Sequence, residues 1–201
     1  MTNSDLLNEF IERRNAIINK IAITAKDYGR NLNEIQLVAA CKTQSVEIID
    51  MAIQAGQFIF GENKVQEGIQ HFQKPNEKLE LRLIGPLQSN KANDAVKTFD
   101  VIETLDRLNL AKELAKAIQK NGKSPQFLIQ INIGEEIQKS GILPHELPNF
   151  IKILNQEYDI KPIGLMCIPP NNLPSAPYFA LLSQMAKEFG LNQLSMGMSS
   201  D

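Results

Sequence analysis

The sequence predicts an α/β fold made of parallel βα units that curl into a barrel. Strand-like apolar runs alternate with helical patterns at a repeat of about 25 residues, and no linker interrupts them. A doubly wound open sheet would also fit this alternation. The glycine-rich phosphate fingerprint of a dinucleotide-binding sheet is missing after the first strand, where Lys42-Thr43-Gln44 stands, and this favours the barrel.

The first helix and the first strand are predicted from their patterns and their ends. Apolar residues recur at helical spacing after Ser4, and Tyr28-Gly29 ends the helix with a glycine. The run 35–41 is almost entirely apolar and ends directly before Lys42, which predicts a buried parallel strand.

The remaining strands and helices follow in strict alternation. Further strands are expected at 58–60, 81–85, 101–102, 127–133, 163–166 and 194–196. Further helices are expected at about 46–55, through 65–72, after Asn90 to about 99, from 108 to a stop at Asn121-Gly122, at about 145–155 and at about 176–189.

Composition and charge narrow the classes of function. Lys and Arg number 21 against 23 Asp and Glu, so there is no basic surplus for nucleic acid. The amino-terminal residues do not resemble a signal peptide and no apolar run could span a bilayer, so we expect a cytoplasmic protein without membrane contact. Cys41 and Cys167 are expected to be buried structural thiols, and no histidine or cysteine spacing suits a metal.

Lys42 is the first candidate for chemistry. An ammonium at the end of a buried strand is costly to desolvate, whereas the neutral amine is a nucleophile that forms Schiff bases with aldehydes. The plain alternative is that Lys42 has left the sheet and lies in water. In a barrel, Lys42, Asn63, Asn132 and the loops around 85–90 and 196–200 would meet at the carboxyl ends of the strands.

The closing segment Gly197-Met198-Ser199-Ser200 predicts an anion cradle. It follows a strand and ends in residues typical of a helix N-cap, whose N–H groups and hydroxyls can bind phosphate, although an N-cap without a ligand is an alternative. A small residue, Ala40, beneath Lys42 would leave space for a flat ring. A Schiff-base lysine and a phosphate cradle together indicate pyridoxal 5'-phosphate, which carries both an aldehyde and a phosphate.

Several motifs resemble the YggS/PROSC family of pyridoxal phosphate homeostasis proteins, in order and spacing, over nearly the whole chain. They are Gly61-Glu62-Asn63-Lys64-Val65-Gln66-Glu67, Ile84-Gly85-Pro86-Leu87-Gln88-Ser89-Asn90-Lys91, Lys139-Ser140-Gly141, Gly164-Leu165-Met166 and Leu194-Ser195-Met196-Gly197-Met198-Ser199. The resemblance implies a TIM-type (β/α)8 barrel like the N-terminal domain of alanine racemase, with the cofactor held as an internal aldimine. Lys42 matches the aldimine lysine, Asn63 the asparagine beside the ring, and Ser199 with the Met198 backbone a phosphate contact.

The sequence also departs from that family. The family's Lys-Thr-Lys-Pro is Lys42-Thr43-Gln44-Ser45 here, and its Trp-His-Phe is Leu81-Arg82-Leu83. The family continues to an eighth strand whose Arg-x-Gly-Thr segment contacts the pyridine nitrogen and the phosphate. We therefore expect residues 1–201 to form one cofactor-binding barrel domain that is incomplete at its carboxyl end and lacks this strand.

The expected function is binding of pyridoxal 5'-phosphate for its buffering or delivery, with PLP-dependent apo-enzymes as possible recipients and without robust turnover. An amino-acid racemase is an alternative, but it needs an acid/base on each face of the ring, and no tyrosine directly follows a strand. A Schiff-base lyase using Lys42 is another. Lys139 could be a second cofactor-accepting lysine or a solvated loop residue, and Glu62 and Glu67 are expected to be helix N-terminal charges.

Overall fold

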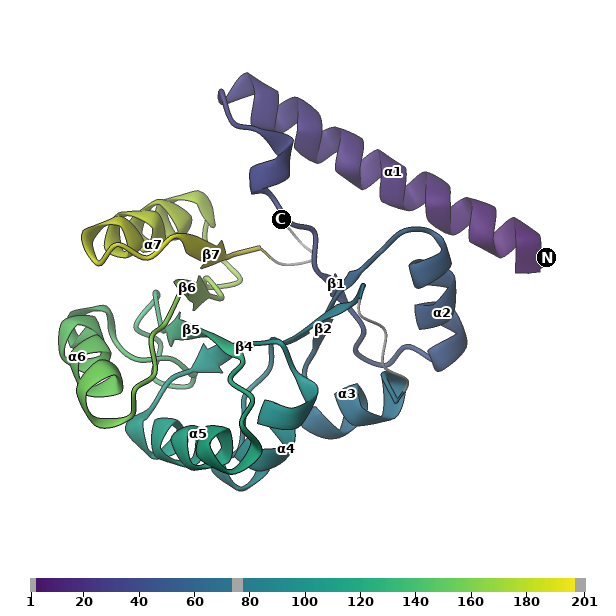
Figure 1. Cartoon of the computed structure of the whole chain (residues 1–201). Coiled ribbons are helices and arrows are strands. Elements are labelled where there is room, and N and C mark those ends of the chain that lie inside the picture. Colours follow the sequence, from purple (N-terminus) through teal and green to yellow (C-terminus); the bar gives the residue numbers. More distant parts are fainter. Residues whose placement is uncertain (1–2, 74–77, 198–201) are drawn as a thin grey trace.

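The computed structural model describes residues 3–73 and 78–197, and a curled parallel sheet forms its centre. Seven strands in these ranges pair in chain order, each parallel to the next. They are β1 (Ala39–Ala40), β2 (Ile59–Glu62), β3 (Glu80–Leu83), β4 (Val101–Leu105), β5 (Gln126–Ile131), β6 (Gly164–Cys167) and β7 (Gln193–Ser195). The sheet curls around an axis and leaves β1 and β7 as its two edges (Figure 1).

The helices between consecutive strands cover the outer face of this sheet (Figure 1). The helices are α1 (Asn3–Asp27), α2 (Val46–Gln54), α3 (Val65–His71), α4 (Ala92–Thr98), α5 (Leu108–Asn121), α6 (Leu147–Glu157) and α7 (Ala176–Glu188), with short 3-10 turns at Leu32–Glu34, Ser89–Lys91 and Pro144–Glu146. A doubly wound sheet carries helices on both faces, so sequential strands with helices on one face confirm the predicted barrel type.

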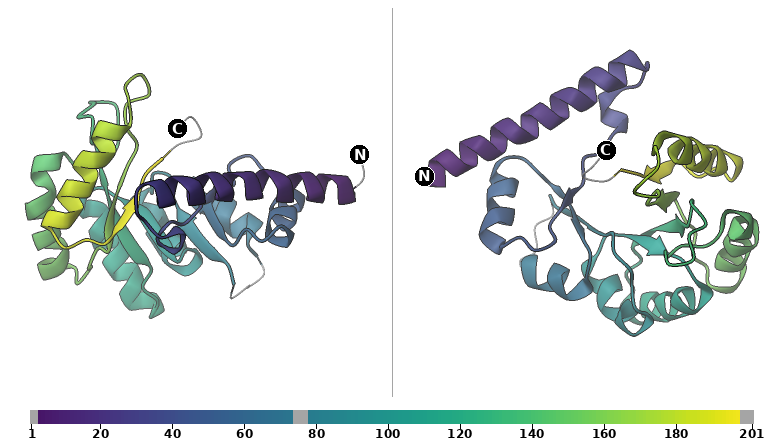
Figure 2. Two further views of the ribbon diagram at one scale, coloured as in Figure 1. Left: turned by 90° about the horizontal axis from the view of Figure 1, so that it is seen from above. Right: turned by 180° about the vertical axis from the view of Figure 1, so that it is seen from behind.

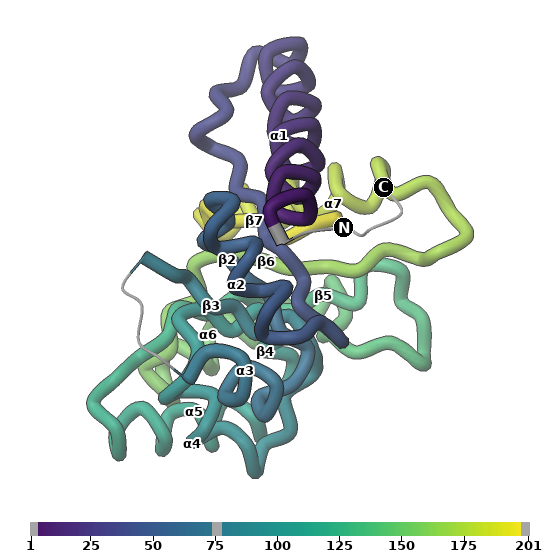
Figure 3. The backbone as a smooth tube through the Cα atoms, turned by 90° about the vertical axis from the view of Figure 1, so that its right-hand side faces the viewer, coloured from purple at the N-terminus to yellow at the C-terminus, as the bar shows by residue number. Residues whose placement is uncertain are grey.

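Helix α1 lies outside the ring of helices, on the side where β1 and β7 leave the sheet open (Figure 2; Figure 3). It packs against α2 and contributes Ala25, which is buried. Gly29 follows α1 with a φ of +65°, so the predicted glycine stop is confirmed. Within the described ranges, none of the helices has the length and apolar character needed to cross a membrane.

Side chains alternate between the helix-facing core and the interior of the curl, which we call the lumen. Helix-facing residues such as Phe60, Leu83 and Ile129 are buried in one large apolar core. On the lumen side, Val101, Leu128 and Met166 form a second, small apolar cluster. The lumen also holds buried polar residues: Arg82, Glu103 and Gln130.

A polar network crosses the lumen from one edge of the sheet to the other. Arg82 donates through Nη1 to Glu103 Oε1 at 3.1 Å and through Nη2 to Gln36 Oε1 at 2.6 Å. Arg82 also pairs with Glu80, at 2.5 Å. The Ser195 hydroxyl donates to Glu103 Oε2 at 2.6 Å. Because Gln36 precedes β1 and Ser195 ends β7, this network ties both open edges together through β3 and β4.

The first strand differs from the prediction. The sequence predicted a buried strand over 35–41, but β1 comprises only Ala39–Ala40, and neither residue is buried. Among the described residues β1 pairs with β2 alone, so its free edge and its lumen face are not covered. Only the helix-facing Cys41, next in the chain, is buried.

Candidate functional site

Lys42 and Asn63 follow neighbouring strands at the carboxyl ends of the sheet, which we call the rim. Ala40 of β1 and Gly61 of β2 are partners in register, and each candidate lies two residues further along its chain. Continuing the alternation of β2 puts Asn63 on the lumen side, whereas Lys42 lies beyond the end of β1, in a turn. Lys42 is exposed and Asn63 is half-buried.

Lys42 lies in a tight turn directly after β1. The Gln44 N–H donates to the Cys41 carbonyl at 2.9 Å, and Thr43 has a φ of +63°. A β-branched residue rarely adopts this left-handed conformation, and strain of this kind, worth about 1–3 kcal/mol, concentrates at functional sites. The turn leads the chain out of the sheet and leaves Lys42 exposed. The argument that burial makes its amine nucleophilic is therefore wrong for this structure.

The loop after β3 holds the backbone at Asn63. The Ile84 N–H donates to the Glu62 carbonyl at 2.9 Å. A Cβ added at Gly85 would lie 2.2 Å from the Asn63 carbonyl oxygen and 2.6 Å from the Asn63 Cα. Glycine is therefore required here, and it sets the position of Asn63 at the rim.

We expect Gly85→Ala to displace Asn63 and to weaken binding of pyridoxal 5'-phosphate, the cofactor that the sequence predicts. Overpacking of this kind costs about 1–3 kcal/mol of stability, so a matched control is needed. Gly122→Ala is the control. Gly122 has a φ of +65°, which strains an alanine, and no atom lies within 4 Å of its Cβ position. This variant should therefore lose stability at the carboxyl end of α5, away from Asn63, without overpacking. Urea denaturation would measure the stability of both variants, and a cofactor titration would measure their binding. Equal binding by the two would refute the role of Gly85.

Small and apolar residues line the lumen just below these candidates. A Cβ added at Gly61 would lie 2.8 Å from Ile84 Cδ1 and 3.1 Å from Val38 Cγ1, so these side chains close over Gly61. Together with Ala40, these residues form an apolar surface beneath the two candidates, which we call the apolar floor. Such a surface suits a flat aromatic ring. Met198 and Ser199, the predicted phosphate contacts, lie outside the described residues.

Glu62 and His71 form a buried pair that the sequence analysis missed. Glu62 Oε1 lies 2.7 Å from His71 Nδ1, and Glu62 Oε2 has no hydrogen-bond partner among the described residues. Burial raises the pKa of the Glu62 carboxyl, although His71 opposes this. The expectation of a helix N-terminal charge is wrong for Glu62, the last residue of β2, and confirmed for Glu67 in the first turn of α3.

The pH dependence of stability should reveal Glu62. Because its pKa is raised in the folded state, the folded protein binds the proton more tightly than the unfolded chain does. The stabilisation that Glu62 contributes to the folded state is therefore complete below the ordinary carboxyl pKa. It is lost as pH rises through the raised pKa. We expect the free energy of unfolding to fall more steeply with rising pH in the wild type than in Glu62→Gln. Urea denaturation across the acidic range would measure this, and parallel curves would contradict it.

Both thiols are buried, as predicted. Burial raises the pKa of Cys41 to about 12, with the Glu62 charge adding to the effect. Burial alone raises the pKa of Cys167 to about 11. Neither sulfur is a reactive thiolate at neutral pH, so these cysteines serve packing.

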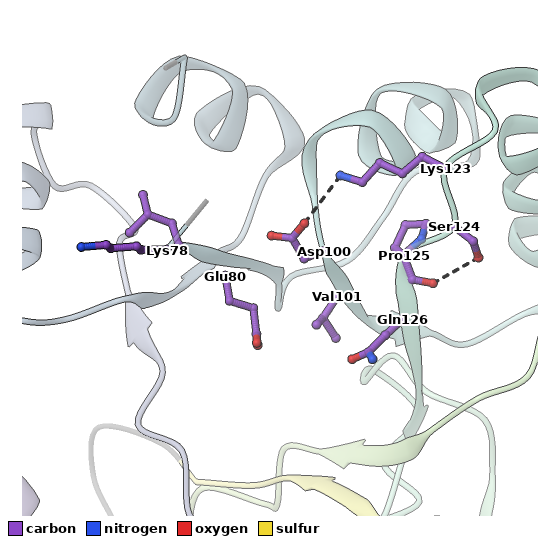
Figure 4. A pocket seen from close by; sticks show the side chains of 9 residues that line it. Lys78, Glu80, Asp100, Val101, Lys123, Ser124, Pro125 and Gln126 are labelled. Atoms are coloured by element: carbon purple, nitrogen blue, oxygen red, sulfur yellow. Dashed lines mark hydrogen bonds and ion pairs between the residues drawn. The ribbon is translucent and has the colours of Figure 1, made fainter. Parts of the chain in front are cut away.

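Two hollows lie at opposite ends of the lumen. One of about 250 Å³ lies inside the rim; we call it the mouth cavity, and it is lined by Ile84, Pro86, Gln130, Gln138, Lys139, Ser140 and Ile168. A larger one of about 530 Å³ lies at the amino ends of β3, β4 and β5 (Figure 4). There Asp100 accepts from the Leu81 N–H at 3.0 Å and pairs with Lys123 at 3.6 Å. Asp100 thus holds strand β3, and this hollow is remote from Lys42.

Asn132 lies near the rim, as predicted, but it supports a loop. Its side chain donates to the Glu136 carbonyl at 2.8 Å and accepts from the Glu136 N–H at 3.1 Å. Both bonds fix the segment that carries Lys139.

Comparison with known proteins identifies the class and then the family. The family model for the alanine racemase N-terminal domain matches residues 19–200, so the chain is a barrel of this class. It is 38% identical to the pyridoxal phosphate homeostasis protein of Haemophilus influenzae, covering 93% of this chain and 84% of the relative. It is also 38% identical to that of Escherichia coli K12, covering 97% and 88%. The chain belongs to the YggS/PROSC family of pyridoxal phosphate homeostasis proteins.

Solved structures agree with this assignment. PipY of Synechococcus elongatus without PLP has a TM-score of 0.78 at 34% identity, covering 90% of each chain. PipY with PLP bound has a TM-score of 0.72 at the same identity and coverage. An alanine racemase of Clostridium difficile, at 15% identity and a TM-score of 0.64, covers 81% of this chain and 45% of its own, and shares the fold.

Proposed function

We propose that this protein binds pyridoxal 5'-phosphate and takes part in its homeostasis as a buffer or carrier. The observation that carries the proposal is the placement of Lys42 and Asn63 at one rim, on neighbouring strands, above the apolar floor around Gly61. The relatives named for pyridoxal phosphate homeostasis, and the PipY structure with PLP bound, support it.

The proposal gives each candidate a role. Lys42 Nζ would form a Schiff base with the aldehyde of the cofactor, and Asn63 would lie beside its ring. The predicted phosphate contacts are the Met198 backbone and Ser199. PLP-dependent apo-enzymes in the cytoplasm would be the recipients of the cofactor.

The tyrosines favour this role over amino-acid racemisation, which needs an acid/base on each face of the ring. Tyr28 follows α1 and is 81% exposed. Tyr158 and Tyr178 pack against the helix-facing core. All three therefore lie away from the rim.

An absorption spectrum with added pyridoxal phosphate tests the proposal. We expect a Schiff-base band and, after borohydride reduction, a single labelled peptide that contains Lys42. A racemase assay on the loaded protein would then distinguish a carrier from an enzyme. The absence of the band, or labels scattered over surface lysines, would refute the proposal.

A further inference from the structure

Gly85 lies between the candidate Asn63 and a buried residue of β4. On one side, a Cβ added at Gly85 would lie 2.2 Å from the Asn63 carbonyl oxygen, so the two backbones are in contact. On the other side, the Thr104 hydroxyl donates to the Gly85 carbonyl at 2.8 Å. Thr104 is 2% exposed, so this hydrogen bond lies in the low-dielectric interior, which strengthens it. A chain of contacts therefore runs from β4 through Gly85 to Asn63.

The link from β4 to Gly85 depends on a side chain. In the described ranges, the paired residues of β3 and β4 end with Leu83 and Ile102. Two residues further along each strand, the Thr104 hydroxyl bonds to the Gly85 carbonyl and continues the connection between them. Serine could make the same bond, whereas valine has the shape of threonine but no hydroxyl to donate.

The loop that follows Gly85 has an anchor of its own. Arg107, which precedes α5, donates through Nη2 to the Leu87 carbonyl at 2.6 Å and to Ser89 Oγ at 3.4 Å. Leu87 is buried beneath this loop. Loss of the Thr104 hydroxyl would therefore release Gly85 locally, while Arg107 keeps the rest of the loop in place.

We propose that Thr104 is a positioning residue for the cofactor site. Its hydroxyl holds Gly85 against the backbone of Asn63 and so sets where the Asn63 side chain lies at the rim. Because Thr104 is buried, it acts through Gly85 and Asn63 rather than by contact with the cofactor. This inference rests on the proposed function, in which Asn63 lies beside the ring of pyridoxal phosphate.

Titration of the full chain with pyridoxal phosphate, followed by the Schiff-base band, tests this role. We expect Thr104→Val to weaken binding by about fivefold, the effect of one buried hydrogen bond. Thr104→Ser, which keeps the hydroxyl, should restore most of the affinity. In an Asn63→Ala background, Thr104→Val should weaken binding no further, because the residue through which it acts has been removed.

Two further measurements separate positioning from general stability. Ile160→Val trims a buried side chain between α6 and β6, so it should lower the urea midpoint and leave the affinity unchanged. The Ile84 N–H, which donates to the Glu62 carbonyl at 2.9 Å, lies next to the contact between Gly85 and Asn63. In protein without cofactor, Thr104→Val should speed hydrogen exchange at this N–H under native conditions, and Ile160→Val should not.

Three results would overturn the role of Thr104. They are equal affinity of Thr104→Val and the wild type, an undiminished effect of Thr104→Val in the Asn63→Ala background, and unchanged exchange at the Ile84 N–H. A wild type without a Schiff-base band would refute the proposed function itself. A normal wild-type band that Thr104→Val leaves unaltered would refute the role of Thr104 alone, so the two failures are distinguishable.

Discussion

Lys42→Ala protein is expected to show no Schiff-base band with pyridoxal phosphate and no borohydride-fixed label in the peptide containing residue 42. Lys42 lies at the rim beside Asn63, and removing its Nζ removes the atom that we propose to bond to the aldehyde. The fold should persist, because Lys42 is exposed and exposed substitutions change stability by only about 0.5 kcal/mol. Absorption spectra, peptide mass mapping and thermal unfolding would measure all three effects.

Two controls separate chemistry from charge. Lys42→Arg keeps the positive charge but supplies no nucleophilic amine, so it should also lose the band. Lys64→Ala removes an exposed lysine near the end of the next strand, paired with Glu67 at 3.0 Å, and should keep both band and label. A band that persists in Lys42→Ala with a label on another lysine would show that Lys42 is not the acceptor.

The barrel was predictable from sequence because the strands β2 to β7 are punctuated by turn residues and apolar on their helix-facing side. The first strand was overestimated, because the apolar run 35–41 carries no sign that its lumen side lies at an open edge. The exposure of Lys42, which follows from the early end of this strand, was equally impossible to predict from the sequence. The strained turn at Thr43 depends on a backbone conformation that no sequence pattern records.

The missed polar residues share one physical reason. Arg82 and Glu103 stand at lumen positions of strands that read as apolar, and their partners come from distant segments. Glu62 was assigned to the helix that follows it, although alternation with Phe60 places it on the helix-facing side of β2. Following the alternation of side chains along β2 could have predicted that Glu62 is buried, because it shares a face with Phe60. Its pairing with His71 could be seen only in the structure.

Replacing Arg82 by methionine should destabilise the protein by about 3–5 kcal/mol, because the carboxylate of Glu103 stays buried without its cation. The loss should appear in urea denaturation at neutral pH as a lower midpoint. Arg13→Met, which removes an exposed pair with Glu9, should cost no more than about 1 kcal/mol.

The double variant Arg82→Met/Glu103→Leu identifies the cause. If the unpaired charge is responsible, removing both partners should recover most of the loss, whereas equal instability of the single and double variants would attribute it to packing. A closed barrel fills its interior with apolar layers, as Val101, Leu128 and Met166 do here. On the open side, Arg82 and Glu103 link β3 and β4 to Gln36 and Ser195 at the two edges. Recovery in the double variant would therefore show that apolar side chains can replace this polar link.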